Sequence, residues 1–321
     1  MYLEPTAKMQ VGDSAKNLTF VNFNKIVIEQ SVKELGGKAT VTLPRNYAKL
    51  NGKSVLDLVK CGDPVTIWMG YDGQLEVEFT GYIREIESSA PLVLNIDDDL
   101  YPLKRTNYLK SWKSVTLNEV LQYVAPGYKV SCPDVNLGAL QLNNVSAFRV
   151  LMDIQQNYGL YTIVRGKNIT CQFPYDIKGT GQMYTYTFYT PTVKKSNLKY
   201  KRAEDNKIRV RVSSKQRNGK TLKAEVGAKE GEGSLYQTTL PPMSESELKT
   251  YAENWYKKLC FDGYTGSITG FGTPRTKAGD TLKIVDSEEP DREGNYLVES
   301  VTITYGLSDG FERENTLSFK V

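Results

Sequence analysis

Histidine is absent from this sequence of 321 residues. Imidazole is the commonest general acid or base in enzymes and a leading ligand for zinc, copper and iron. Its absence therefore excludes Ser-His-Asp and Cys-His nucleophilic sites, HExxH metalloprotease sites and most transition-metal centres. Chemistry based on a pair of carboxylates or on lysine remains available to the chain.

Paired cysteines and long apolar runs are also missing. The four cysteines form no CxxC pair, which argues against a zinc ribbon or a redox motif; they are Cys61, Cys132, Cys171 and Cys260. We expect them to be buried, reduced thiols. No apolar run approaches the ~20 residues that span a bilayer, and residues 1–12 show no secretory signal pattern. We therefore expect a protein made in the cytoplasm, without a membrane anchor.

The charge balance gives no sign of a nucleic-acid partner. Lys and Arg number 41 and Asp and Glu 37, for a net charge of +4. Proteins that bind nucleic acids usually show a clearly basic domain or stripe. No specific nucleic-acid partner is predicted.

What the sequence does contain is a strand-rich pattern with a helical region in the middle. Apolar and polar residues alternate in 20–28 and 39–43, as half-buried strands require. Segments 64–70 and 75–79 flank Asp72-Gly73, a strong hairpin signal because glycine accepts the positive φ of a tight turn. In the middle, Thr116 and Glu119 form a capping-box pattern, and a second helix is predicted from Ser146 to Gly159.

Strand signals return in the last third of the chain. Segments 207–212 and 221–226 predict a hairpin around Asn218-Gly219. Ser244 and Glu247 form a second capping-box pattern, and the apolar face of the helix that follows is expected to lie in the core; it carries Tyr251, Trp255 and Leu259. We predict a β-rich α+β fold with two antiparallel β-barrel-like domains, residues 1–102 and 181–321, flanking a small α+β domain, residues 103–180.

The two strand-rich regions share a local signature. Gly62-Asp63 opens a strand segment, 62–67, that matches 279–284, opened by Gly279-Asp280, in residue type at five of six positions. A strand beginning with tyrosine follows each, at Tyr82 and Tyr296. Gly-Asp before a strand is also a common turn. We interpret the repeat as a structural duplication, which in a trimer would present six similar barrels to a sixfold tube.

These segments resemble a known family. Residues 62–72 and 79–83, with the acidic end 97–105, resemble the first barrel of phage late control gene D proteins, the baseplate hub family that includes the hub half of VgrG spike proteins. Residues 114–121 resemble the family's first helix, 148–161 its second helix and the strand that follows, and 279–298 its second barrel. The resemblance covers most of residues 60–321.

The resemblance implies a structural role in the virion tail or baseplate of a phage or prophage. It implies a homotrimeric ring that joins the tail tube to the spike, with tape-measure or other baseplate proteins as further partners. VgrG chains continue into a needle and this sequence ends at Val321, so we expect the spike to be a separate polypeptide. We predict no enzyme activity, catalytic residue, metal or cofactor.

Several alternatives stay open. The hub could belong to a type VI-like or other contractile injection system. The chain could instead be a glycan-binding module of a tail, because tyrosines are abundant and Tyr184, Tyr186 and Tyr189 lie in one run, although tyrosine also packs well on sheets. A peptidoglycan hydrolase would need two close carboxylates, one with a raised pKa.

Two charged clusters are candidate binding sites. Asp97, Asp98 and Asp99 carry the oxygen ligands that Ca²⁺ prefers, but they lack the spacing of a calcium loop, which favours a solvated strand end. The basic run could contact nucleic acid or a tape-measure protein, but the alternation in 207–212 favours a solvated or intersubunit strand face; the run comprises Lys194, Lys195, Lys199, Lys201, Arg202, Lys207, Arg209 and Arg211.

Overall fold

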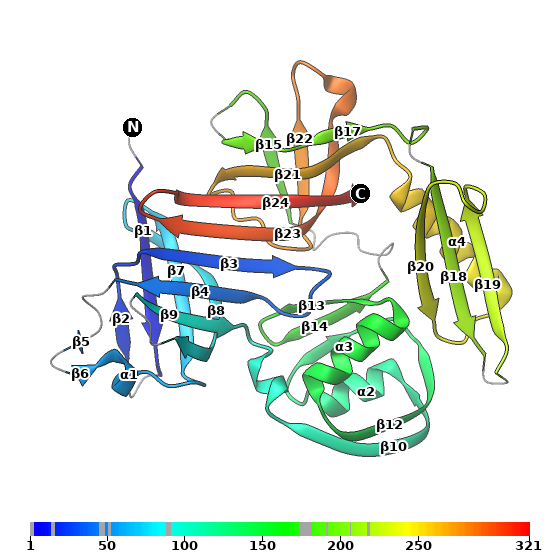
Figure 1. The fold of residues 1–321 in the computed structure, drawn as a ribbon, viewed down its shortest axis with the longest axis horizontal. Helices are drawn as coiled ribbons and strands as arrows, with labels where there is room; N and C mark the ends of the chain where they lie inside the picture. The colour runs from blue at the N-terminus through cyan, green and yellow to red at the C-terminus, as the bar shows by residue number, and fades with distance from the viewer. Residues whose placement is uncertain are drawn as a thin grey trace.

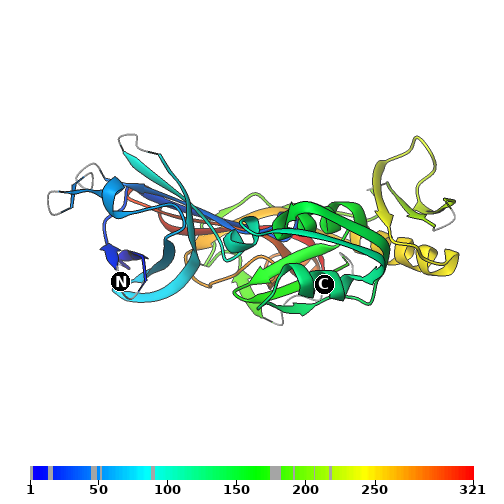
Figure 2. The same cartoon turned by 90° about the horizontal axis from the view of Figure 1, so that it is seen from below.

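The computed structural model describes residues 3–13, 17–44, 49–50, 53–87, 91–173, 182–190, 192–205, 207–216 and 219–321. Strands dominate these residues and four α-helices accompany them, so the predicted β-rich α+β class is confirmed. A large sheet occupies one side of the molecule, and two smaller units extend from it (Figures 1 and 2). Among the described residues, no helix has the length and apolar character to cross a membrane.

A first set of six strands comes from the first hundred residues. They are antiparallel neighbours in the order β1-β7-β8-β9-β4-β3. Asp72 and Gly73 both have positive φ in the β7–β8 turn, as the predicted hairpin requires. The bounds are β1 (Pro5–Val11), β3 (Lys25–Ser31), β4 (Lys38–Leu43), β7 (Pro64–Tyr71), β8 (Gln74–Glu87) and β9 (Leu92–Asp97), with the short elements β2 (Leu18–Phe20), β5 (Lys49–Leu50), β6 (Lys53–Ser54) and α1 (Val55–Leu58).

A second set repeats this order. Its strands are neighbours in the order β15-β22-β23-β24-β21-β16, with β17 continuing β16 along β21. Along the chain, the strands of both sets take these positions in the same order: the first, sixth, fifth, second, third and fourth. One difference is that β15 is parallel to β22, whereas β1 is antiparallel to β7. The bounds are β15 (Met183–Thr187), β16 (Lys195–Ser196), β17 (Lys199–Lys201), β21 (Gly263–Phe271), β22 (Thr281–Val285), the 3-10 helix η4 (Pro290–Arg292), β23 (Gly294–Gly306) and β24 (Gly310–Lys320).

The two sets join into one sheet. Strand β3 pairs antiparallel with the second half of β23, where Ile28 faces Ile303. Both isoleucines are buried in a hydrophobic cluster that draws on both sets. The predicted pair of barrel-like domains is not confirmed, because the described strands form one open sheet whose main path runs from β16 to β2.

The middle region folds as a small α+β unit between the two sets. In helix α2, Thr116 and Glu119 exchange the hydrogen bonds of the predicted capping box, and α3 ends at Gly159, whose φ is +61°. Both helix predictions are confirmed. The bounds are η2 (Tyr101–Lys104), β10 (Asn107–Thr116), α2 (Leu117–Val124), β11 (Lys129–Ser131), β12 (Asn136–Ser146), α3 (Ala147–Tyr158), β13 (Tyr161–Arg165) and β14 (Asn168–Gln172).

A second unit interrupts the second set between β17 and β21. It consists of β18 (Ile208–Lys215), β19 (Thr221–Gly227), β20 (Ser234–Leu240) and α4 (Glu245–Leu259). The predicted β18–β19 hairpin and the Ser244–Glu247 capping box are both confirmed, although Asn218 lies outside the described residues.

This unit shares a hydrophobic cluster with the middle unit. Tyr251 is buried there and packs edge-on against Phe173, while Trp255 and Leu259 are partly buried, as the expected core face predicts. The domain limits proposed at residues 102 and 180 stay predictions, and the second falls outside the described residues.

Candidate functional site

A β-bulge turns Glu78 into the interior of the molecule. In the β7–β8 pair, Ile67 faces Phe79 and Trp68 faces Val77, so Glu78 has no partner on β7. An extra residue of this kind reverses the alternation of side chains and re-aims one of them. The side chain of Glu78 is 1% exposed, whereas Val77 is 47% exposed. The bulge therefore buries a carboxylate where simple alternation would place it in solvent.

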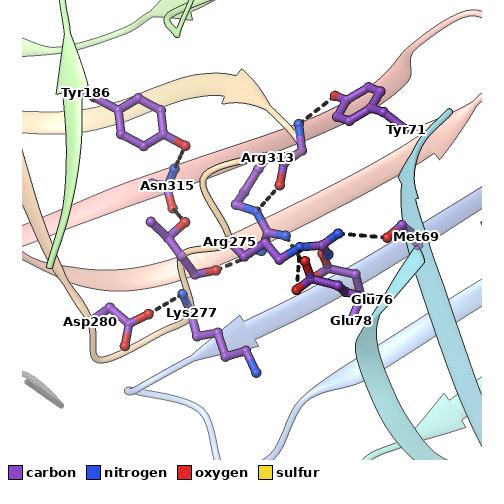
Figure 3. Close-up of polar contacts among 12 residues, drawn as sticks. Met69, Tyr71, Glu76, Glu78, Tyr186, Arg275, Lys277, Asp280, Arg313 and Asn315 are labelled. Atoms are coloured by element: carbon purple, nitrogen blue, oxygen red, sulfur yellow. Dashed lines mark hydrogen bonds and ion pairs between the residues drawn. The ribbon is translucent and has the colours of Figure 1, made fainter. Parts of the chain in front are cut away.

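Two arginines of the second strand set meet this carboxylate (Figure 3). Arg313 of β24 is fully buried, and its Nη2 lies 2.8 Å from Oε2 of Glu78. Arg275, in the loop between β21 and β22, donates from Nη1 to Oε1 of Glu78, and its Nε lies 3.2 Å from Oε2 of the exposed Glu76. Buried charges in a low-dielectric interior require partners of this kind. We name Glu78, Arg275 and Arg313 the buried ionic cluster.

Backbone carbonyls accept the remaining hydrogen bonds of the two guanidinium groups. Arg313 donates from Nε to the carbonyl of Gly272 (3.0 Å) and from Nη1 to that of Thr276 (2.7 Å). Arg275 donates from Nη2 to the carbonyl of Met69 (2.9 Å). Burial lowers the pKa of Arg313 to about 10, so this side chain remains charged at neutral pH. The cluster therefore holds β7, β8 and β24 in one arrangement.

Neutral side chains extend the network on either side. Tyr71 donates to the carbonyl of Phe311 and accepts from the N–H of Gly272, both at 3.0 Å. On the other side, Thr276 donates to Asn315, which donates to the hydroxyl of Tyr186 at 3.1 Å. Burial raises the pKa of Tyr71 and of Tyr186, so both hydroxyls stay protonated at neutral pH.

The chemistry of the cluster is that of a clamp. Both carboxylate oxygens of Glu78 already accept hydrogen bonds from guanidinium groups. The neighbouring cavity, which Glu78 and Asp98 help to line, has a volume of about 180 Å³. Ligand pockets for small molecules usually have ~300–1,000 Å³. The buried ionic cluster is suited to joining the two strand sets, and the neighbouring cavity is too small to enclose a typical substrate.

Sequence reasoning did not single out these three residues. A signal existed for Arg313, because it shares a strand face with Phe311, Leu317 and Phe319, which are buried in β24. A charged residue in the buried phase of a strand indicates an interior partner. No comparable signal marked Glu78, whose burial depends on the bulge.

The two Gly-Asp turns predicted as a repeat are built alike. Gly62 and Gly279 both have positive φ, near +90°. Asp63 accepts from the N–H of Lys60 at 2.8 Å, and Asp280 accepts from the N–H of Lys277 at 2.7 Å. Each glycine also donates to the following long strand, at the carbonyl of Ile83 in one set and of Val298 in the other. Tyr82 pairs with Pro64, and Leu297 pairs with Thr281 at the equivalent position. Leu297, rather than Tyr296, is therefore the counterpart of Tyr82.

Asp280 contacts the middle unit and Asp63 provides the equivalent turn contact in the other set, which gives a pair of variants to compare. Asp280 is 1% exposed and also accepts from Nη2 of Arg165, in the middle unit, at 2.9 Å. Replacing Asp280 with Ala is expected to lower the free energy of unfolding by about 2–3 kcal/mol, because it removes a buried hydrogen bond to a charged group. Replacing Asp63 with Ala removes the turn contact alone and is expected to cost about 1 kcal/mol. Urea unfolding of both variants measures the difference, and equal losses would contradict this account of Arg165.

The three neighbouring aspartates have separate partners. Asp97 accepts from Nζ of Lys104 at 2.6 Å, Asp98 accepts from the N–H of Gly37 and of Leu100, and Asp99 accepts from Oγ1 of Thr80. Burial raises the pKa of Asp98. In the part of the chain that the structure describes, no cluster of three acidic or cysteine side chains is arranged to hold a metal ion.

The basic run divides between two places. Lys195, Lys199 and Lys201 lie on β16 and β17, at the edge of the large sheet. Arg209 and Arg211 lie on one face of β18, as the alternation predicts, and both pair with Glu225 and Glu230. Acidic partners therefore balance the arginines of β18, which argues against a nucleic-acid surface there.

The tyrosines and cysteines are placed less uniformly than expected. Tyr186 is buried in the sheet, Tyr184 is partly exposed, and Tyr189 is 69% exposed at a positive φ. All four cysteines are free, but only Cys171 is buried, and Cys61 is exposed in the first Gly-Asp turn. The expectation of four buried thiols was therefore wrong, because Cys61 lies in a turn rather than in a core strand.

Comparisons with known proteins find similarity in structure alone. No protein-family model matches the sequence, and no curated protein matches it. A tail protein from Neisseria meningitidis superposes with a TM-score of 0.64 at 13% identity, covering 98% of this chain and 96% of the other. The 43 kDa tail protein of prophage MuSo2 from Shewanella oneidensis gives 0.65 at 14% identity, covering 98% of both chains.

The chain has the fold of phage tail proteins. A third neighbour is an E. coli component of the type VI secretion system, described as similar to tail proteins of bacteriophage T4; its TM-score is 0.54 at 9% identity, covering 100% of this chain and 74% of the other. Identities this low show a common fold and do not by themselves establish a common function.

Proposed function

We propose that this chain is a structural hub protein of a phage or prophage tail, without enzyme activity, which assembles as a trimeric ring between the tail tube and the spike. The observation that carries the proposal is the repeated order of six strands, in a chain of which 98% superposes on a tail protein and on a prophage tail protein. A repeat of this kind gives each chain two similar surfaces.

Three such chains would present six similar strand sets around one axis. A threefold ring could then dock onto a sixfold tube by repeating one kind of contact. In this proposal the buried ionic cluster fixes the two sets of a chain relative to each other, which a regular ring requires. The same architecture would serve a type VI-like injection system, which the fold shared with the E. coli component supports as a second setting.

The test is the mass of the assembly in solution. We expect native mass spectrometry and light scattering to find a particle of three times the 36.1 kDa chain mass. Class averages of negatively stained particles should show a ring with threefold symmetry and a central opening. A chain that remains monomeric at about 100 µM, alone and with its tail-tube protein, would overturn the proposal.

A further inference from the structure

The junction between the two strand sets suggests how one chain meets the next. Within the chain, β3 is the edge strand of the first set, and it pairs with Ser300–Gly306 of β23 in the second set. The corresponding edges are the outer side of β17 and residues 85–87 of β8. Among the described residues, neither of these edges is paired. The chain therefore forms one junction of this kind within itself. The equivalent two edges have no partner strand among the described residues.

The correspondence of β8 with β23 follows from their registers. Both strands carry a bulge at the same place, between Ile83 and Glu85 in β8 and between Val298 and Ser300 in β23. Beyond the bulge, residues 85, 86 and 87 occupy the positions of residues 300, 301 and 302. These are the residues of β23 that begin the pairing with β3.

The correspondence of β17 with β3 is found in the same way. Ile86 faces Leu94, whose neighbour across the sheet is Val41, and Val301 faces Asn315, whose neighbour is Ile268. Val41 and Ile268 are therefore equivalent. They face Ile26 and Ser196 in the next strands, which makes Ser196 the counterpart of Ile26. Four residues further on, Tyr200 is the counterpart of Gln30, so residues 199–201 correspond to residues 29–31.

Transferring the internal register to the open edges produces matching charges. In the junction within the chain, Ser300 faces Ser31, Val301 faces Gln30 and Thr302 faces Glu29. The same register between two chains places Glu85 opposite Lys201, Ile86 opposite Tyr200 and Glu87 opposite Lys199. Two carboxylates therefore face two ammonium groups, and directly opposite charges stabilise an antiparallel pair.

The present contacts of these side chains leave room for such a pairing. Among the described residues, neither Lys199 nor Lys201 has an acidic side chain within ion-pair distance. Nζ of Lys201 donates to the carbonyl of Leu259 at 3.0 Å and lies 3.9 Å from the centre of the Phe261 ring, contacts that it would exchange for Glu85 in the pairing. Glu85 lies 3.2 Å from the adjacent Arg84, and Glu87 accepts from the amide of Asn95. Lys199, Glu85 and Glu87 are exposed.

We propose that β17 of one chain pairs antiparallel with residues 85–87 of β8 in a second copy of the same chain, in the register just given. The proposal rests on the proposed hub function. The two edges lie on opposite sides of the β3–β23 junction (Figure 1), so the contact is head to tail. Repetition of a head-to-tail contact closes into a ring when its rotation permits. The sheet would then continue from chain to chain.

Cross-linking between two singly substituted chains tests the register. In a Cys61→Ser/Cys132→Ser/Cys260→Ser background, which leaves only the buried Cys171, a Glu87→Cys chain is mixed with a Lys199→Cys chain and treated with a short bismaleimide. We expect a dimeric product from the mixture and none from either chain alone. The control replaces Lys199→Cys with Lys195→Cys, an exposed position four residues earlier, displaced by ~13 Å along the edge. Its yield is expected to be at least about tenfold lower, as the spacing predicts.

Charge reversal provides a second, independent measurement. Glu87→Lys and Lys199→Glu should each raise the concentration at which the trimer dissociates by about tenfold or more, because each places like charges opposite each other at every contact. The Glu87→Lys/Lys199→Glu double variant should restore assembly to within about threefold of the parent, since opposite charges face each other again.

The outcomes separate the two proposals. A trimer that shows neither the selective cross-link nor the restoration overturns this edge pairing and leaves the hub function standing. A chain that stays monomeric under every condition, without the cross-link, overturns both. A selective cross-link with restoration of assembly supports the pairing.

Discussion

Replacing Glu78 with Gln is expected to lower the free energy of unfolding by about 3–5 kcal/mol, since removing one partner of a buried ion pair leaves an uncompensated charge inside the protein. Arg313 is fully buried and would lose its only carboxylate partner in the cluster. The neutral amide cannot balance two guanidinium groups, and its –NH₂ group would face one of them. Urea unfolding followed by circular dichroism measures the loss.

The chain offers a matched control two residues away. Glu76 also contacts Arg275, but its side chain is 71% exposed, so Glu76→Gln is expected to change stability by at most about 1 kcal/mol. A Glu78→Gln/Arg313→Met double variant, which removes the fully buried guanidinium as well, should recover part of the loss. Equal effects of Glu78→Gln and Glu76→Gln on the free energy of unfolding would show that the buried ionic cluster does not stabilise the fold.

Truncating a buried side chain at the junction of the two strand sets should lower the free energy of unfolding by nearly as much. Ile28→Ala and Ile303→Ala are each expected to lower the free energy of unfolding by about 2–5 kcal/mol, because each removes a buried side chain from a packed core. The two isoleucines face each other across the β3–β23 pair. Residues in direct contact do not contribute independently, so the double variant should lose less than the sum of the two single losses.

Val77→Ala is the control for this series. Its side chain is 47% exposed on β8, and the change in stability should stay within about 0.5 kcal/mol. Additive losses at positions 28 and 303 would indicate that the two strand sets do not share a continuous core.

Local features were predictable from the sequence, because their interactions span only a few residues. The capping boxes at Thr116 and Ser244 depend on a partner three residues away, and Gly159 ends its helix by its own conformation. The Asp72-Gly73 turn determines its hairpin in the same way. Propensity and short-range hydrogen bonds decide such elements before the chain is compact.

The arrangement of the strands and the buried ionic cluster were not predictable in this way. Glu78 and Arg313 are separated by 235 residues, and nothing in either segment specifies the other. The bulge at Glu78 also reverses an alternation that the sequence displays clearly, since Val77 rather than Glu78 faces outward. The repeat of Gly-Asp turns was visible in the sequence, but the joining of the two sets through β3 and β23 was not.

The β3–β23 junction has a consequence for folding during synthesis on the ribosome. Strand β3 leaves the ribosome about 275 residues before its partner, Ser300–Gly306, as the pairing of Ile28 with Ile303 shows. At ~5–20 residues per second, the edge of β3 waits roughly 15–55 s for its partner. An unpaired strand edge invites pairing with a neighbouring nascent chain, and outward charges such as Lys25 and Glu29 oppose this. Until β23 has been synthesised, the edge of β3 is therefore open to aggregation.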